Sequence, residues 1–220
     1  MATPSSARLR AFVRRHTRLV PVPDVPGVRL HLADDAMTVM RLAGRELGQS
    51  DPALPYWAFA WSGGLALARF LVDRPQEVAG RRVLDLGSGS GLCAIAAVRS
   101  GAASVLAIDV DPLSEAAVAV NARANGVQVG FGRQDPLSLA PPECDVILAG
   151  DVCYEETMAG RMIDWLRRAH DRGIRTLIGD PGRAYLPAGL ERRATYRVRS
   201  SLEIEESPIK DASVFTFGTS

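Results

Sequence analysis

The sequence predicts an α/β protein with a doubly wound, mostly parallel, seven-stranded sheet, helices on both faces and an antiparallel last strand. From Arg81 onward, short apolar runs that read as strands alternate with helical segments, the order that builds a parallel sheet. The apolar runs are nearly continuous, which is typical of strands buried on both faces. Residues 194–206 and 211–218 have no full helix between them, so we expect them to pair antiparallel.

Composition narrows the class of protein. The chain has 220 residues, of which 47% are hydrophobic and 23% charged, with a net charge of +1. This fits a single domain, in which residues 1–54 form a helical and extended N-terminal segment packed on residues 55–220. The near-neutral charge and the lack of a membrane-length apolar run argue against nucleic acid or membrane partners. We expect a monomer.

The cysteines and the N-terminus bear on location. Cys93, Cys144 and Cys153 form no CxxC pair, which fits a reduced, cytoplasmic setting. The N-terminus is rich in Arg and Ser and has no acid before Asp24, a composition that mitochondrial transit peptides share. We favour a bacterial cytoplasmic protein over the mitochondrial matrix, because Arg replaces Lys along the whole chain and Lys210 is the only lysine.

Each element follows from a local pattern. The Pro-punctuated residues 20–35 separate an N-terminal helix from a second one over 36–47, capped by Asp34 or Asp35 and ended by Gly48. A third helix over 62–75 closes at Pro75. Further strands are expected over 81–87, 103–110, 127–132, 144–151 and 174–180, and further helices over 91–101, 112–126 and 155–173.

A glycine-rich loop, "LGSGSG", follows the first strand of the alternating part. Gly87, Gly89 and Gly91 allow a tight turn into the next helix and close approach of a ligand. Residues 89–94 also match the G-x-G-x-x-A pattern of dinucleotide dehydrogenases. Asp85 decides between the ligands, because a pyrophosphate at this helix start would face its carboxylate, whereas a cation would be attracted. S-adenosylmethionine (SAM) carries an ammonium and a sulfonium and no phosphate, so the loop predicts SAM.

Two further acids extend the predicted cofactor site. Asp109 ends the second strand, where an acid can accept hydrogen bonds from both ribose hydroxyls. Asp135 follows the third strand, where the adenine would lie. It either accepts from the exocyclic amine or caps a turn, and the sequence leaves both open.

The glycine loop, Asp85 and Asp109 resemble those of class I SAM-dependent methyltransferases. Three other segments make the match more selective: "PYWAFAWSGGLALARFL" before the loop, "LAGDVCYEE" after the fourth strand and "LIGDPGRAYLP" after the fifth. Together they look like the seven-β-strand protein lysine methyltransferases, particularly the branch that modifies the electron transfer flavoprotein β-subunit and its bacterial relatives. The resemblance covers about residues 55–187.

The resemblance implies a SAM-dependent N-methyltransferase acting on lysine side chains of a protein such as the electron transfer flavoprotein β-subunit. It implies that Trp61 packs on the SAM site, and that Asp151 and Tyr154 face the acceptor amine. It also implies that the cofactor is held by Asp85, Gly87, Gly89 and Asp109. From the residues alone, Trp57 and Trp61 are either core residues or a cover for a cation, and we favour Trp61 as the cover.

The reaction itself constrains the "DVCYEE" segment. Methyl transfer from SAM is a direct displacement that needs no enzyme nucleophile, so we expect Cys153 to be a buried structural thiol. Asp151 can receive the substrate ammonium, as a base or as a positioner, or it caps the helix that starts near Glu155. Tyr154 adds a hydroxyl or a ring face. Two later residues, Asp180 and Arg183, form a turn or contact substrate.

Three other functions fit the sequence less well than protein lysine methylation. A small-molecule N-methyltransferase uses the same chemistry, but the chain has no large insertion to close over a small substrate, which favours a protein. A dinucleotide-dependent oxidoreductase conflicts with Asp85. A non-catalytic SAM-fold binding module conflicts with the intact glycine loop and the D-x-x-Y motif at Asp151. No metal site is predicted.

Overall fold

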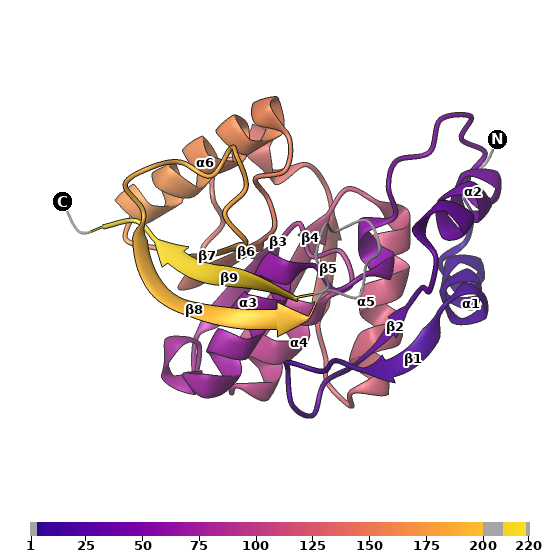
Figure 1. Cartoon of the computed structure of the whole chain (residues 1–220), viewed down its shortest axis with the longest axis horizontal. Helices are drawn as coiled ribbons and strands as arrows, with labels where there is room; N and C mark the ends of the chain where they lie inside the picture. Colours follow the sequence, from indigo (N-terminus) through magenta and orange to yellow (C-terminus); the bar gives the residue numbers. More distant parts are fainter. Residues whose placement is uncertain (1–3, 200–208, 219–220) are drawn as a thin grey trace.

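A seven-stranded sheet lies at the centre of the computed structural model, which describes residues 4–199 and 209–218. Its strand order is β5-β4-β3-β6-β7-β9-β8 (Figure 1). The strands are β3 (Arg82–Leu86), β4 (Ser104–Asp109), β5 (Gly130–Arg133), β6 (Val146–Gly150), β7 (Arg175–Asp180), β8 (Glu191–Arg199) and β9 (Ile209–Thr216). The first five run parallel, and β9 is antiparallel to both β7 and β8. The predicted α/β class is confirmed; the 200–206 part of the predicted last pair lies outside the described residues.

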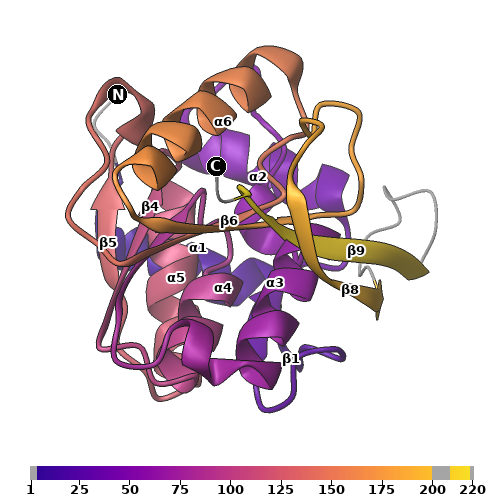
Figure 2. The same ribbon diagram turned by 90° about the vertical axis from the view of Figure 1, so that its left-hand side faces the viewer.

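Six α-helices surround the sheet: α1 (Ser6–His16), α2 (Ala36–Leu47), α3 (Ser62–Asp73), α4 (Leu92–Arg99), α5 (Pro112–Ala124) and α6 (Glu156–Asp171). Figure 2 shows α3, α4 and α5 on one face of the sheet and α6 on the other. Buried side chains of α3 and α4 pack with one face of the strands, and those of α6 pack with the opposite face. Helices therefore cover both faces, as predicted.

The helices cover the α6 face of the sheet unevenly. On the α6 face, the loop residues Leu137, Cys144, Leu186 and Leu190 complete the packing beside the helix. Further toward the sheet edge, Leu106 of β4 remains 38% exposed. The expectation of strands buried on both faces thus holds for β3, β6 and β7 and is wrong for β4, because α6 lies over the other half of the sheet.

A two-stranded antiparallel hairpin, β1 (Arg18–Pro21) and β2 (Arg29–Leu32), was not predicted in the Pro-punctuated segment. Its strands have only four residues each, too short for a periodic signal. The hairpin is bound by side chains outside it, because Asn121 of α5 and Asn125, the residue that caps α5 at its C-terminus, accept the backbone N–H groups of His31 (2.7 Å) and Arg29 (2.9 Å).

Most predicted helix ends are confirmed. Asp35 caps α2 and accepts from the Thr38 N–H, and Gly48 ends it in the left-handed region at φ 69°. The strand expected over 127–132 forms only as β5, Gly130–Arg133. Three short 3₁₀ helices complete the structure: η1 (Tyr56–Ala58), η2 (Pro75–Glu77) and η3 (Pro136–Ser138). Among the described residues, no helix combines the length and apolar character needed to span a membrane.

Candidate active site

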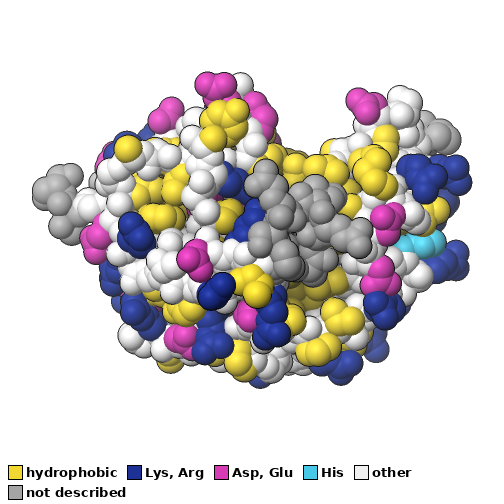
Figure 3. Space-filling model, in the orientation of Figure 1, with side chains coloured by type: hydrophobic (Ala, Val, Ile, Leu, Met, Phe, Trp, Pro, Cys, Tyr) yellow, Lys and Arg dark blue, Asp and Glu magenta, His cyan; other side chains and the backbone are white. Residues whose placement is uncertain are grey.

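A cavity of about 1320 Å³ lies where the carboxyl ends of β3, β4, β6 and β7 meet. Its walls include Ala43 and Leu47 of α2 on one side and Met158 and Met162 of α6 on the other. Figure 3 shows the corresponding hollow between the parts of the molecule built on these two helices, with hydrophobic side chains inside it. Ligands of open α/β sheets bind at this edge, so the cavity is the candidate site.

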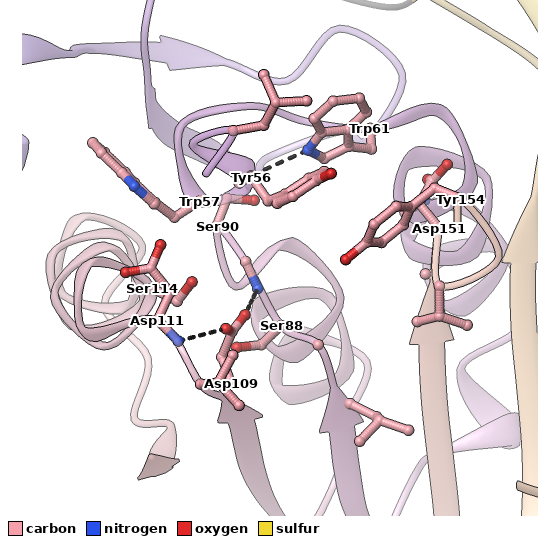
Figure 4. Close-up of a pocket in the computed structure, with 18 of the residues that line it drawn as sticks. Tyr56, Trp57, Trp61, Ser88, Ser90, Asp109, Asp111, Ser114, Asp151 and Tyr154 are labelled. Carbon is pink, nitrogen blue, oxygen red and sulfur yellow. Dashed lines mark hydrogen bonds between the residues drawn. The ribbon is translucent and has the colours of Figure 1, made fainter. Parts of the chain in front are cut away.

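The glycine loop forms the floor at one end of the cavity. Gly87, Gly89 and Gly91 all have positive φ, at 66°, 49° and 79°, which explains why the turn needs glycine. The Gly89 N–H donates to Asp109 Oδ2 at 2.9 Å, and the Asp111 N–H donates to Asp109 Oδ1 at 3.0 Å (Figure 4). Asp109 therefore joins the loop to the end of β4.

Asp85 lies beneath this loop and is only 2% exposed. Its Oδ2 accepts from the backbone N–H of Ala94 at 3.0 Å, so it anchors the first turn of α4. Burial, followed by the nearby charge of Asp109, raises the pKa of Asp85 to about 7, against the opposing effect of the Ala94 hydrogen bond. A cation bound in the cavity near this carboxyl would stabilise its ionised form.

An aromatic wall faces the loop across the cavity. Tyr56 stacks with Trp61 on one side (ring centroids 5.3 Å apart) and with Tyr154 on the other (4.9 Å). The Trp61 indole N–H donates to the Tyr56 carbonyl at 3.1 Å, as Figure 4 shows. Both Trp57 and Trp61 line the cavity, but Trp57 is fully buried and belongs to the core, whereas Trp61 is only half-buried. Tyr56 was not singled out from the sequence, although it lies in the "PYWAFAW" segment.

Asp151 lies at the opposite end of the cavity from Asp109 (Figure 4). It is the one described non-glycine residue with positive φ, at 56°, and is 8% exposed. Its Oδ2 accepts from the Gly64 N–H at 2.8 Å, in the first turn of α3. The alternative of a cap for the following helix is wrong, because Glu155 caps α6 through the Thr157 and Met158 N–H groups.

The second oxygen of Asp151 binds Arg183. The Arg183 Nη2 and Nε lie 2.7 and 3.2 Å from Asp151 Oδ1. Desolvation raises the pKa of Asp151 to about 6, and the charge and hydrogen bonds of Arg183 hold it down from a higher value. Tyr154 lies beside Asp151 in Figure 4; it is 44% exposed, and desolvation is the main cause that raises its pKa to about 12.

Two further residues named from the sequence, Asp135 and Cys153, differ in their burial and in their contacts. Asp135 lines the cavity, but its carboxylate caps η3 through the Leu137 N–H (3.0 Å) and pairs with Arg161 (3.3 Å), the geometry of a turn acid. Its contact with adenine stays a prediction. Cys153 is fully buried, as expected of a structural thiol, and burial raises its pKa to about 12. Within the described ranges no cluster of His, Cys, Asp and Glu could hold a metal ion.

Comparison with known proteins agrees with this geometry. The electron transfer flavoprotein beta subunit lysine methyltransferase of Xenopus laevis is 37% identical over 215 residues, which cover 94% of this chain and 86% of that protein. The chain belongs to this methyltransferase family. The human and rat members are 38% and 45% identical over shorter stretches, which cover 65% and 51% of their lengths.

More distant matches share part of the lysine methyltransferase fold. The family model of ribosomal protein L11 methyltransferase (PrmA) matches residues 69–151, from α3 through the glycine loop to Asp151. A proposed RNA methyltransferase from Pyrococcus horikoshii superposes with a TM-score of 0.56 at 14% identity, covering 77% of this chain and 91% of that one. SMU.776, a proposed methyltransferase solved with S-adenosylhomocysteine (SAH), superposes with a TM-score of 0.53 at 13% identity, covering 76% of this chain and 51% of that one. These structures show the same fold.

Proposed function

We propose that this chain transfers methyl groups from SAM to lysine side chains of the electron transfer flavoprotein β-subunit. The observation that carries the proposal is the 37% identity to the Xenopus laevis enzyme over 86% of that protein's length. The arrangement of the site supports the proposal, because the glycine loop and a buried carboxylate, Asp151, lie at opposite ends of one cavity. A dinucleotide-dependent oxidoreductase is disfavoured, because Asp85 lies under the loop where a pyrophosphate would bind.

The residues at the loop end fit SAM. The Ser88 Oγ is buried without a hydrogen-bond partner within the described part of the chain, and it lines the cavity. An unpaired buried hydroxyl is costly, so a polar ligand group at this point would be stabilising. Asp85 and Asp109 would hold the ammonium and the ribose of the cofactor, and Trp61 would cover its sulfonium. When bound, SAM supplies an electrophilic methyl group.

The acceptor end fits an amine. A lysine would arrive as an ammonium and would have to lose a proton, to Asp151 or to bulk water, before its nitrogen could accept the methyl group; SAH would be the leaving group. Asp151 would receive the ammonium and orient the neutral amine, and Tyr154 would flank it. Catalysis by positioning and desolvation of this kind contributes on the order of 7–11 kcal/mol.

The test is methylation of a defined protein. Purified enzyme is incubated with recombinant electron transfer flavoprotein β-subunit and SAM, and the products are examined by intact and peptide mass spectrometry. We expect steps of about 14 Da on lysine, the mass of one methylene, and binding of SAH but not NAD in calorimetry. An enzyme that binds SAH yet leaves this protein unmodified would show a different substrate, and one that binds NAD instead would refute the methyltransferase chemistry.

A further inference from the structure

The hydrogen bonds of Asp151 leave its carboxylate nearly saturated. Oδ2 accepts one N–H, from Gly64, and Oδ1 accepts two, from Nη2 and Nε of Arg183. A carboxylate offers about four lone-pair sites, so these three bonds, counted within the described residues, leave one on Oδ2. The oxygen with the remaining acceptor position is therefore the one that lies at the start of α3.

Arg183 is held in place by its own backbone. Asp180, at the end of β7, accepts the N–H groups of Gly182 and Arg183 through Oδ1, both at 2.7 Å. Gly182 has a φ of 89°, which completes the turn. Because Asp180 is fully buried, this turn is anchored to the sheet rather than to the surface. The "GDPGR" segment thus delivers a guanidinium to Asp151 from a fixed direction.

The surroundings of Asp151 make this cation important. The side chains of Arg183 and Asp151 are 24% and 7% exposed, so solvent screens their pair less than it screens a surface pair. Among the described residues, the other ionisable groups near Asp151 and Arg183 are Asp180, whose charge opposes ionisation, the thiols of Cys93 and Cys153, and the phenols of Tyr56 and Tyr154. Burial raises the pKa of both thiols, so they are neutral. Arg183 offsets both burial and the charge of Asp180.

We propose that Arg183 is a positioning residue that keeps Asp151 ionised and directs its open Oδ2 site toward the substrate amine. The inference rests on the proposed lysine methyltransferase function. It assigns two steps to two residues: Arg183 orients and ionises, and Asp151 touches the substrate. Without the guanidinium, Asp151 would take up a proton near neutral pH and could no longer accept a hydrogen bond from the ammonium at that oxygen.

The test compares Arg183→Met and Arg183→Lys with a matched control, Arg82→Met. Arg82 forms a similar fork with Asp145, with Nη2 to Oδ1 at 3.0 Å, but at the amino end of β3 away from the cavity. We measure kcat/KM for methylation of the electron transfer flavoprotein β-subunit between pH 6 and 9. At each pH, the kcat/KM of a variant is divided by that of the native enzyme, so that the titration of the substrate lysine cancels.

We expect Arg183→Met to lose roughly 10- to 100-fold at pH 7, the scale of a charge-assisted hydrogen bond, and less at pH 9, where Asp151 ionises even without its partner. Arg183→Lys keeps the charge but not the fork, so it should recover part of the activity. If Arg183→Met does not fold, Arg183→Gln, which is also uncharged, tests the same pH dependence. A loss that is the same at every pH, or no loss, would overturn the proposal.

A second measurement does not depend on the substrate. A carbon-13 carboxyl NMR titration, assigned with Asp151→Asn, follows Asp151 directly in native protein, Arg183→Met and Arg82→Met. We expect the titration midpoint of Asp151 to move to higher pH only in Arg183→Met; an unmoved midpoint refutes the inference. A native enzyme that fails to methylate the flavoprotein subunit refutes the proposed substrate, while the titration still decides the role of Arg183.

Discussion

Two buried carboxyl groups, Asp85 and Asp151, line the same cavity, and burial raises the pKa of both. Their partners differ. Asp85 is bound by one backbone N–H, of Ala94, and lies beneath the loop, whereas Asp151 is bound by a backbone N–H and a guanidinium. Asp85 therefore offers a cation a charge that no cationic side chain among the described residues pairs, and this difference supports the proposed roles of Asp85 at the cofactor and of Asp151 at the acceptor amine.

Replacing Asp151 with Asn tests the acceptor-site role. The amide oxygen can still accept from the Gly64 N–H, so the start of α3 is preserved, but the neutral side chain cannot hold an ammonium. We expect kcat/KM for lysine methylation to fall by an amount that corresponds to a loss of about 3–4 kcal/mol of transition-state stabilisation. The affinity for SAH should be nearly unchanged. Methylation rate, SAH affinity and melting temperature are measured on one preparation. Native-like activity would show that Asp151 serves only to cap α3.

The pKa of Asp85 predicts a pH-dependent affinity for the cofactor product. An ionised Asp85 attracts the SAH ammonium, and the carboxyl takes up a proton as the pH falls through about 7. Binding of the cation should therefore weaken below this pH, by up to about tenfold per unit. Calorimetry from pH 6.5 to 8.5 checks the slope, since Asp111 and Asp151 titrate lower, near 6. Asp85→Asn should bind SAH weakly and without this slope.

At the scale of elements, α3 approaches β7 more closely than side chains would allow. A Cβ on Gly63 would collide with the Gly179 carbonyl oxygen and lie 2.6 Å from Asp151 Oδ2, and a Cβ on Gly179 would collide with the Gly63 carbonyl. This close contact brings the Gly64 N–H to Asp151. The two glycines thus connect the packing of a helix on the sheet with the geometry of the acceptor site.

Gly63→Ala should displace the start of α3, because the colliding atom belongs to a backbone and cannot move aside. We expect a loss of about 2–4 kcal/mol in the free energy of unfolding, together with lost methylation. Gly160→Ala in α6 is the matched control, since a Cβ there meets open space, and it should gain about 0.5–1 kcal/mol. Chemical denaturation of both variants measures the difference; equal stabilities would contradict the close packing.

At the scale of the whole molecule, the N-terminal segment is tied to the cofactor loop through one buried side chain. Asn121 of α5 accepts the His31 N–H of the hairpin at 2.7 Å and donates to the Ser90 carbonyl of the glycine loop at 2.9 Å. Buried residues of α1, η1 and α5 also form one apolar cluster. The described part of residues 1–54 therefore packs against α5 and the glycine loop, while the single-domain organisation of the chain stays a prediction.

Asn121→Ala leaves both backbone groups unpaired and should loosen the hairpin and the glycine loop together. We expect a stability loss of about 2–4 kcal/mol and weaker SAH binding. Asn125→Ala is the control, because Asn125 binds the same hairpin through the Arg29 N–H and carbonyl without touching the loop. Hydrogen exchange should show the β1–β2 hairpin loosened in both variants. Residues 87–91 should lose protection only in Asn121→Ala. Identical loop protection in the two variants would contradict the coupling.

The order of strands and helices, the cofactor loop and its two acids follow from the sequence alone, because each rests on local signals. Apolar periodicity marks elements, caps such as Asp35 mark their ends, and glycine spacing marks a turn that needs positive φ. Asp85 and Asp109 could be placed because parallel strands bring their carboxyl ends to one edge. The short hairpin carried no such signal.

The acceptor site depended on tertiary contacts between residues far apart in the chain. Asp151 is bound by Gly64 and Arg183, neither of which is a neighbour in sequence, so the spacing around "DVCYEE" favoured the acceptor role but still allowed a cap for the next helix. Likewise Tyr56 joins Trp61 and Tyr154 only because η1 folds over the loop. Local patterns determine which elements form, whereas the partners of a buried charge are decided by packing, since burial leaves a carboxylate stable only where donors converge on it.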